Sequence, residues 1–121
     1  MKRVLQSIGL ILVVLSAVAV AAPAGAQTAG ECQVIIADLG ETTLAVTSFT
    51  NAKDQAGLVG KLDSAASKLE QGKLDDSVQA LIQFQSRVIT LSEQGKIDGG
   101  DARALVNGAG NAINCVSSLT T

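Results

Sequence analysis

The sequence predicts an all-α fold, a small bundle of about four helices closed by one disulfide bond. Three observations support this prediction. Apolar residues recur at helical spacing in successive segments, and glycines and capping residues separate those segments. The chain also holds two cysteines, one near each end of the helical region, which suits a single closing disulfide.

Residues 1–26 have the pattern of a signal peptide. They begin with a basic pair, continue with a mainly apolar run over 4–22, and end in Ala24 and Ala26, the small residues of a signal-peptidase site. We expect cleavage before Gln27 and a mature protein that is secreted, periplasmic or at the cell surface, free of the membrane. An uncleaved anchor is the alternative, because a run of nineteen residues nearly crosses a bilayer.

The mature chain, residues 27–121, contains few of the side chains that carry out catalysis. It has no histidine, tryptophan or tyrosine. Loss of the basic pair leaves seven Lys and Arg against eleven Asp and Glu, a net charge of −4. The basic residues stand singly among acidic ones, so they do not form the cluster that binds a phosphate backbone. We therefore expect no nucleic-acid partner, no enzymatic activity, no cofactor and no metal.

The first helical segment, residues 32–50, also has features of a strand. It is rich in β-branched side chains, which favour strands. Strict alternation of apolar and polar residues fails, however, and one set of positions shares a helical face, so we predict a helix. That set is Cys32, Ile35, Ile36, Leu39, Thr43, Val46 and Phe49. Residues 27–31 are predicted to be a short loose lead-in.

The second segment carries a clearer apolar stripe. A cap at Asn51 or Asp54 begins this helix, and Gly72 ends it. The stripe consists of Leu58, Leu62, Ala65, Ala66 and Leu69.

A third helix is predicted from about Asp75-Asp76 to Glu93, with Gly95 ending it in the left-handed conformation. Because almost nothing separates it from the second helix, the two are expected to form an antiparallel hairpin. Its apolar side consists of Leu74, Val78, Leu81, Ile82, Val88 and Ile89, widened by Phe84 and Leu91.

The last helix is predicted over Gly99–Leu119. Asp98 is placed to cap its free amides, and Asp101 lies three residues on, in a capping-box-like arrangement. Its stripe consists of Ala102, Leu105, Val106, Ala109, Ala112, Ile113 and Val116. Leu105 and Ile113 lie near the centre of this stripe, so we expect both to be buried.

Export determines how the two cysteines are interpreted, because thiols outside the cytoplasm commonly oxidise. Cys32 and Cys115 are therefore expected to form one intramolecular disulfide, with Cys115 at the margin of the last stripe. The bond would close a loop of about eighty-four residues, worth roughly 4 kcal/mol in the chain-entropy model. A catalytic or metal-binding role is the alternative, but the chain has no CxxC motif and no histidine to complete such a site.

The acidic residues are better explained as helix starts than as a catalytic or calcium site. Asp75 and Asp76 are adjacent, so on a helix they point about 100° apart and do not face each other as an acid and base pair. The stretch from Asp98 to Asp101 lacks the alternating oxygen ligands and closing glutamate of an EF-hand loop.

Amide side chains form the one candidate binding surface. Asn107, Asn111 and Asn114 share an exposed face of the last helix, as Gln79 and Gln83 do on the helix before it. Such faces can hydrogen-bond a glycan. They are also common as plain surface, and the flat aromatic rings that strengthen sugar sites are missing.

Several motifs follow one another in a recognisable order. They are a Leu-x-x-Lys-Leu-x-x-Ala core within Leu58 to Leu69, a break at Gly72, the Gln- and Phe-containing stretch 80–84, the Gly-Lys start at 95–97, and the Ala/Leu/Ile helix from Ala102 to Ile113. From about residue 35 to 119 the chain resembles the FIMAH domain, a small helical module of secreted prokaryotic hydrolases and surface proteins. Two departures stand out, because the family usually accompanies a catalytic domain and the cysteine pair is an addition.

The resemblance covers about nine tenths of the mature chain. It implies a non-catalytic accessory or interaction module, whose partner would be an unidentified protein or a cell-surface polymer. The alternative is a carrier of a small apolar ligand in a cavity between helices, for which Gly57, Gly60, Gly108 and Gly110 would leave room. Close helix packing is the other explanation of these glycines.

Overall fold

The computed structural model describes residues 28–119 and shows a bundle of four helices without strands in that range. The helices are α1 (Ala29–Ala45), α2 (Ala52–Glu70), α3 (Leu74–Glu93) and α4 (Gly99–Ser118). The prediction of an all-α bundle is confirmed. The predicted leader and its cleavage site at Ala24, Ala26 and Gln27 lie outside the described residues.

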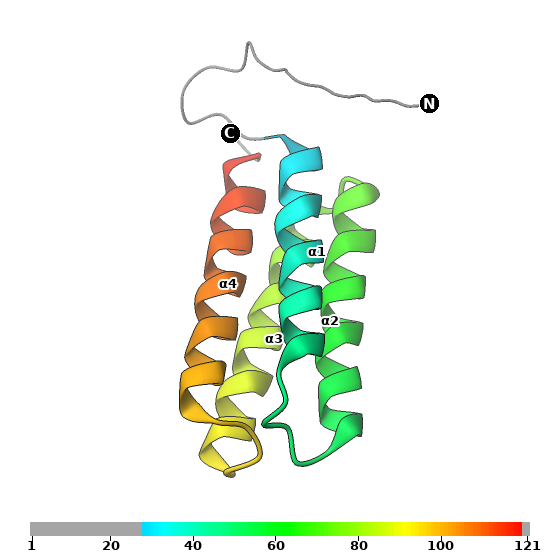
Figure 1. Cartoon of the computed structure of the whole chain (residues 1–121). Coiled ribbons are helices and arrows are strands. Elements are labelled where there is room, and N and C mark those ends of the chain that lie inside the picture. Colours follow the sequence, from blue (N-terminus) through cyan, green and yellow to red (C-terminus); the bar gives the residue numbers. More distant parts are fainter. Residues whose placement is uncertain (1–27, 120–121) are drawn as a thin grey trace, which may run out of the picture.

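The helices run alternately up and down, and together they form a closed ring (Figure 1). Each helix packs on its neighbour in the chain, and α1 also packs on α4. The start of α1 and the end of α4 therefore lie at one end of the bundle, while the α1–α2 and α3–α4 connections lie together at the other (Figure 1).

Helix α1 begins earlier and ends earlier than predicted. Thr28 and Glu31 form a capping box, in which Thr28 Oγ1 accepts from the Glu31 amide at 3.1 Å and Glu31 Oε1 accepts from the Thr28 amide at 2.8 Å. Residues 28–31 are thus ordered by the cap rather than loose. At the other end Val46 is extended, in keeping with its β-branched side chain, so the predicted continuation to Thr50 is wrong.

The C-terminal end of α1 is held by α2. The side-chain amide of Gln55 lies within hydrogen-bonding distance of the carbonyls of Thr43 (2.9 Å), Leu44 (3.2 Å) and Val46 (3.2 Å). These are among the carbonyls that a helix end leaves without a partner in its own backbone. A side chain of the second helix therefore satisfies the end of the first.

The predicted starts and ends of the other helices are largely confirmed. Asn51, rather than Asp54, caps α2 by accepting from the Lys53 amide at 2.8 Å. Gly72 and Gly95 have positive φ angles of 76° and 72°, as the predicted left-handed helix ends require. Asp98 caps α4 through the amides of its first turn.

The core lies along the axis of the bundle and draws on every helix. Its largest fully buried side chains include Leu58, Leu62, Leu81, Phe84, Leu91 and Leu105. Leu105 is buried as expected, whereas Ile113 is only partly buried, at the edge of the core. The inward face of α4 passes through Ala112, and the next residue is rotated by about 100°.

The predicted apolar side of α3 is rotated in the structure. Phe84 and Leu91 are fully buried and define its inward face, while Ile82 and Ile89 are 39% and 47% exposed. An apolar stripe too wide for one face does not show which of its edges turns inward. The neighbours of α3 decide this, since Phe84 needs the room at the centre of the bundle.

The predicted disulfide joins Cys32 of α1 to Cys115 of α4, with their Cα atoms 5.6 Å apart. Both cysteines are buried, so Cys115 belongs to the core rather than to its margin. Farther along the same two helices, a Cβ added at Gly108 would lie 2.8 Å from Leu39 Cδ1. The α1–α4 seam, the line along which these helices pack, therefore has a covalent link at one point and a close approach of the two helices at another.

The other helix pairs are joined by side chains that donate to a neighbouring backbone. Gln33 of α1 donates to the Ala66 carbonyl of α2 at 2.9 Å, and Gln85 of α3 donates to the Val106 carbonyl of α4 at 3.0 Å. The buried Ser77 of α3 donates to a carbonyl of α2 at 2.8 Å. Each such bond satisfies a polar group inside a helix interface, where an unpaired one would be destabilising.

The burial pattern predicts how alanine substitutions rank. Leu105→Ala should lower the free energy of unfolding by about 2 to 5 kcal/mol, because it leaves a cavity at the centre of the core. Ile113→Ala should cost less, and Ile89→Ala should change stability by about 0.5 kcal/mol or less. Urea denaturation measures all three. An unchanged midpoint for Leu105→Ala would show that the inward face of α4 is misassigned.

The disulfide should account for a large share of the stability. Replacing Cys32 and Cys115 by serine should leave helicity largely intact and lower the free energy of unfolding by roughly 2 to 4 kcal/mol. Circular dichroism and denaturant titration measure the two effects, and thiol labelling of the unfolded, non-reduced protein checks the bond itself. Two free thiols per chain, or a covalent dimer, would contradict the intramolecular pair.

Candidate functional site

The predicted amide residues lie on the surface but form two separate polar faces. Asn107, Asn111 and Asn114 are all exposed on α4, and Gln79 and Gln83 are exposed on α3.

The two sets face different seams of the ring. Asn111 lines a groove between α4 and α1, beside Ile35 and Leu39. Gln83 instead accepts a hydrogen bond of 3.1 Å from Lys61 Nζ on α2. The α1–α4 and α2–α3 seams lie on opposite sides of the ring, so the structure does not bring the two sets of amides together.

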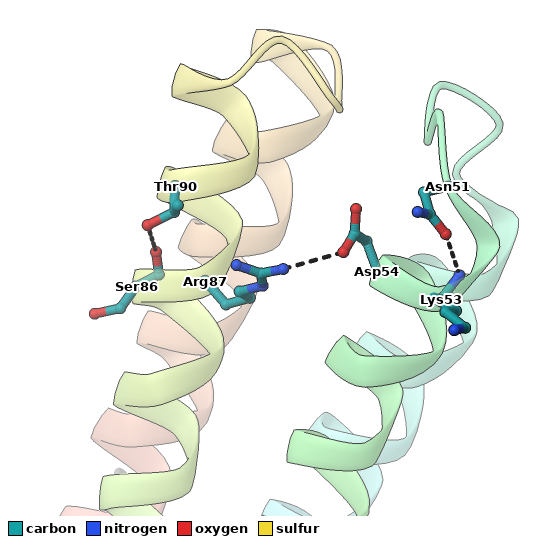
Figure 2. A network of polar contacts seen from close by, with 6 residues as sticks. All are labelled: Asn51, Lys53, Asp54, Ser86, Arg87 and Thr90. Carbon is teal, nitrogen blue, oxygen red and sulfur yellow. Dashed lines mark hydrogen bonds and ion pairs between the residues drawn. The ribbon is translucent and has the colours of Figure 1, made fainter.

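A polar network that was not predicted from the sequence joins α2 to α3 (Figure 2). Arg87 Nη2 of α3 lies 3.0 Å from Asp54 Oδ1 near the start of α2. The side chain of Asp54 is only 12% exposed, against 46% for Arg87, and its second oxygen is buried without a hydrogen-bond partner among the described residues. The ion pair thus compensates a carboxylate that packing has largely removed from water.

The rest of this network is local to each helix. Asn51 accepts from the Lys53 amide at the start of α2, and Thr90 donates to the Ser86 carbonyl one turn earlier in α3 (Figure 2). Neither bond links the helices. The Asp54–Arg87 pair is therefore the part of the network that orients α2 against α3.

A second cluster ties the α1–α2 connection to the start of α4. The backbone amide of Asp98 donates to Ser48 Oγ at 3.1 Å, and the Ser48 hydroxyl donates to Asp101 Oδ2 at 2.7 Å. In the predicted capping box the Asp101 carboxylate would accept directly from the Asp98 amide. The structure inserts the Ser48 hydroxyl between them, so that detail of the prediction is corrected.

A backbone bond reinforces this end of the bundle. The Thr50 amide donates to the Lys96 carbonyl at 3.1 Å and so joins the two connections directly. Asp98 also accepts from the amides of Gly100 at 2.9 Å and Asp101 at 3.4 Å. Both acidic residues are thereby occupied in starting α4, which is the structural role that the sequence indicated.

The other residues weighed as catalytic or metal-binding candidates also have structural roles. Asp75 and Asp76 are exposed in the first turn of α3, where negative charge favours the helix dipole. Both cysteines are bonded to each other. Within the part of the chain that the structure describes, no group of three His, Cys, Asp or Glu side chains is placed to hold a metal ion.

The four glycines considered for a ligand cavity have different surroundings. Gly57 and Gly60 have open space where a Cβ would lie, and both are exposed on α2. A Cβ added at Gly108 would collide with Leu39 Cδ1, whereas one added at Gly110 would make an ordinary van der Waals contact with Gln85. The depressions along the helix seams are open surface grooves.

None of the helices within residues 28–119 has the length and apolar character needed to cross a bilayer. Comparisons of the chain with family models, with curated proteins and with solved structures find no match. The likeness to the FIMAH domain therefore rests on the motifs quoted above.

Two glycine substitutions should have opposite effects on stability. Gly60→Ala should raise the free energy of unfolding by about 0.5 to 1 kcal/mol, because alanine favours the helix and the site is open. Gly108→Val should lower it by about 1 to 3 kcal/mol, because the added atoms meet Leu39. Thermal denaturation compares both with the unsubstituted protein. Equal stabilisation by the two changes would show free space at the α1–α4 seam.

Proposed function

We propose that the chain is an exported, non-catalytic accessory module that binds through its helix surfaces. The observation that carries this proposal is the filled and closed interior. Phe84 and the surrounding leucines occupy the axis of the bundle, and the α1–α4 disulfide closes the ring. Contacts with another molecule are then made by the outer faces of the helices and the grooves between them.

Export is supported by two independent features. Residues 1–26 have the pattern of a cleavable signal peptide. The buried Cys32–Cys115 bond is of the kind that persists in oxidising compartments outside the cytoplasm. The FIMAH-like order of motifs adds the role, since it resembles a module that accompanies exported hydrolases and surface proteins. The partner in this proposal is an exported protein or a cell-surface polymer.

A carrier of a small apolar ligand is less well supported. A carrier needs interior volume for its ligand. Gly108, the glycine nearest the interior of the α1–α4 seam, is instead in close contact with Leu39, while Gly57 and Gly60 face outward. The glycines thus support close packing and a solvated surface rather than a ligand chamber.

Native mass spectrometry of the protein exported by the organism that makes it tests this proposal. The expected species begins at Gln27, carries one intramolecular disulfide, holds no apolar small molecule, and elutes partly with a larger exported component in gel filtration. A bound lipid-like ligand would favour the carrier instead. Retention of residues 1–26 in the membrane fraction would make the chain an anchored protein.

A further inference from the structure

A continuous groove runs along the α1–α2 seam. Its two sections share Gln33, Asp63 and Ala66 as lining residues and have volumes of about 580 and 270 Å³. On α1 the lining extends from Ala29 to Leu44, a rise of about 22 Å at 1.5 Å per residue. The groove is long enough for about four turns of a helix.

The smaller section of this groove has a mainly apolar floor of small or aliphatic side chains. That floor is formed by Ile36, Ala37, Gly40, Val59 and Leu62. At one end Leu44 is 62% exposed, and Val34, on the adjoining face of α1, is 60% exposed. Two of the most exposed large apolar side chains therefore lie in or beside one groove, where they add apolar contact area.

The rim of the groove is acidic. Glu41, Asp63 and Glu70 line it, and all three are exposed. Within residues 28–119 their carboxylates form no ion pair. Helix α1 contains no Lys or Arg. Its other two acids do not line this groove, because Asp38 lies at the α1–α4 groove and Glu31 accepts from the Thr28 amide in the capping box.

The basic residues lie away from this groove. Lys61 of α2 bonds to Gln83 of α3, so it lies on the other side of α2. Lys68 is seven residues on and shares that side. All seven basic residues of the mature chain lie outside the groove, together with eight of its eleven acids. The groove therefore has a net charge of −3 and the rest of the mature chain a net charge of −1.

We infer that the α1–α2 groove binds a basic amphipathic helix of another exported protein. Apolar side chains at positions i, i+3 or i+4, and i+7 of that helix would fill the floor, in the manner of helix-in-groove recognition. Its flanking Lys and Arg would pair with Glu41, Asp63 and Glu70. This inference rests on the proposed function and names the binding surface and the chemistry of its partner.

Charge distinguishes this occupant from the other kinds of molecule that bind apolar grooves. A second copy of the chain would bring its own three rim carboxylates against the same three, and like charges placed together are strongly unfavourable. An anionic membrane surface would be repelled for the same reason. A cationic helix gains from both the apolar floor and the acidic rim.

Two synthetic peptides of sixteen residues test the inference with the disulfide-bonded mature protein. Both peptides carry leucines at helical spacing, and their flanks are lysine in one and glutamate in the other. The lysine peptide should bind and gain helicity on binding. Its affinity should fall at least tenfold between about 50 and 500 mM salt. The glutamate peptide should bind at least tenfold more weakly. Calorimetry and circular dichroism measure affinity and helicity.

Substitutions then locate the site. Glu41→Lys combined with Asp63→Lys should lower the affinity for the lysine peptide at least tenfold. Leu44→Asp alone should have the same effect. The matched control combines Asp76→Lys with Ile89→Asp on α3, which changes comparable exposed residues away from the groove and should leave the affinity unchanged. Circular dichroism of each variant establishes that it is folded.

Several results would overturn the inference: no binding of the lysine peptide, equal loss in the α3 control, dimerisation that Leu44→Asp abolishes, or binding to anionic vesicles. If one of these results is obtained while the protein is still exported and associated with a larger component, the groove is excluded as the binding surface and the accessory-module proposal stands. Failure of the export experiment alone would remove the module proposal and leave peptide binding by the groove measurable.

Discussion

The α1–α4 contact is the constraint on which the rest of the bundle depends. Helix α1 contributes only four buried residues, and one of them, Thr43, uses its hydroxyl to bond to the Leu39 carbonyl at 2.8 Å. Its apolar face alone is therefore modest. Three contacts with α4 compensate for this small apolar face. Two come from α1 itself, the disulfide at one end and the close approach of Leu39 to Gly108 farther along. The third comes from the α1–α2 connection, where the Ser48 hydroxyl donates to Asp101. Without them, α1 would be held only along α2, and the ring would be open at the α1–α4 seam.

Closing the ring also creates the surfaces available for binding. With α1 held against α4, its opposite side lies along α2 and forms the acidic groove, stabilised by the bond from Gln33 to the Ala66 carbonyl. Helix α2 turns Asp63 toward this groove and Lys61 toward α3. The segregation of charge therefore follows from the order of the helices around the ring, and it places the apolar floor and the carboxylates on one face.

Much of the fold could be predicted because it depends on local patterns. The stripes of α2 and α4, the left-handed glycines and the Asp98 cap follow from spacing and residue type, and the cysteine pairing follows from the expected export and the even count. The start of α1 was missed although its signal, Thr28 followed three residues later by Glu31, is present in the sequence.

Other features depend on how neighbouring helices are rotated against each other. That rotation buries Phe84 and exposes Ile89, and it brings Asp54 to Arg87. The two amide faces were found on their own helices, but their separation and the acidic groove required the positions of all four. Native-state hydrogen exchange before and after reduction of the disulfide tests whether the α1–α4 contact holds α1 in the bundle. Reduction should accelerate exchange in α1 at least tenfold more than around Phe84 in α3. A uniform change in all four helices, or unaltered protection of α1, would contradict this role of the contact.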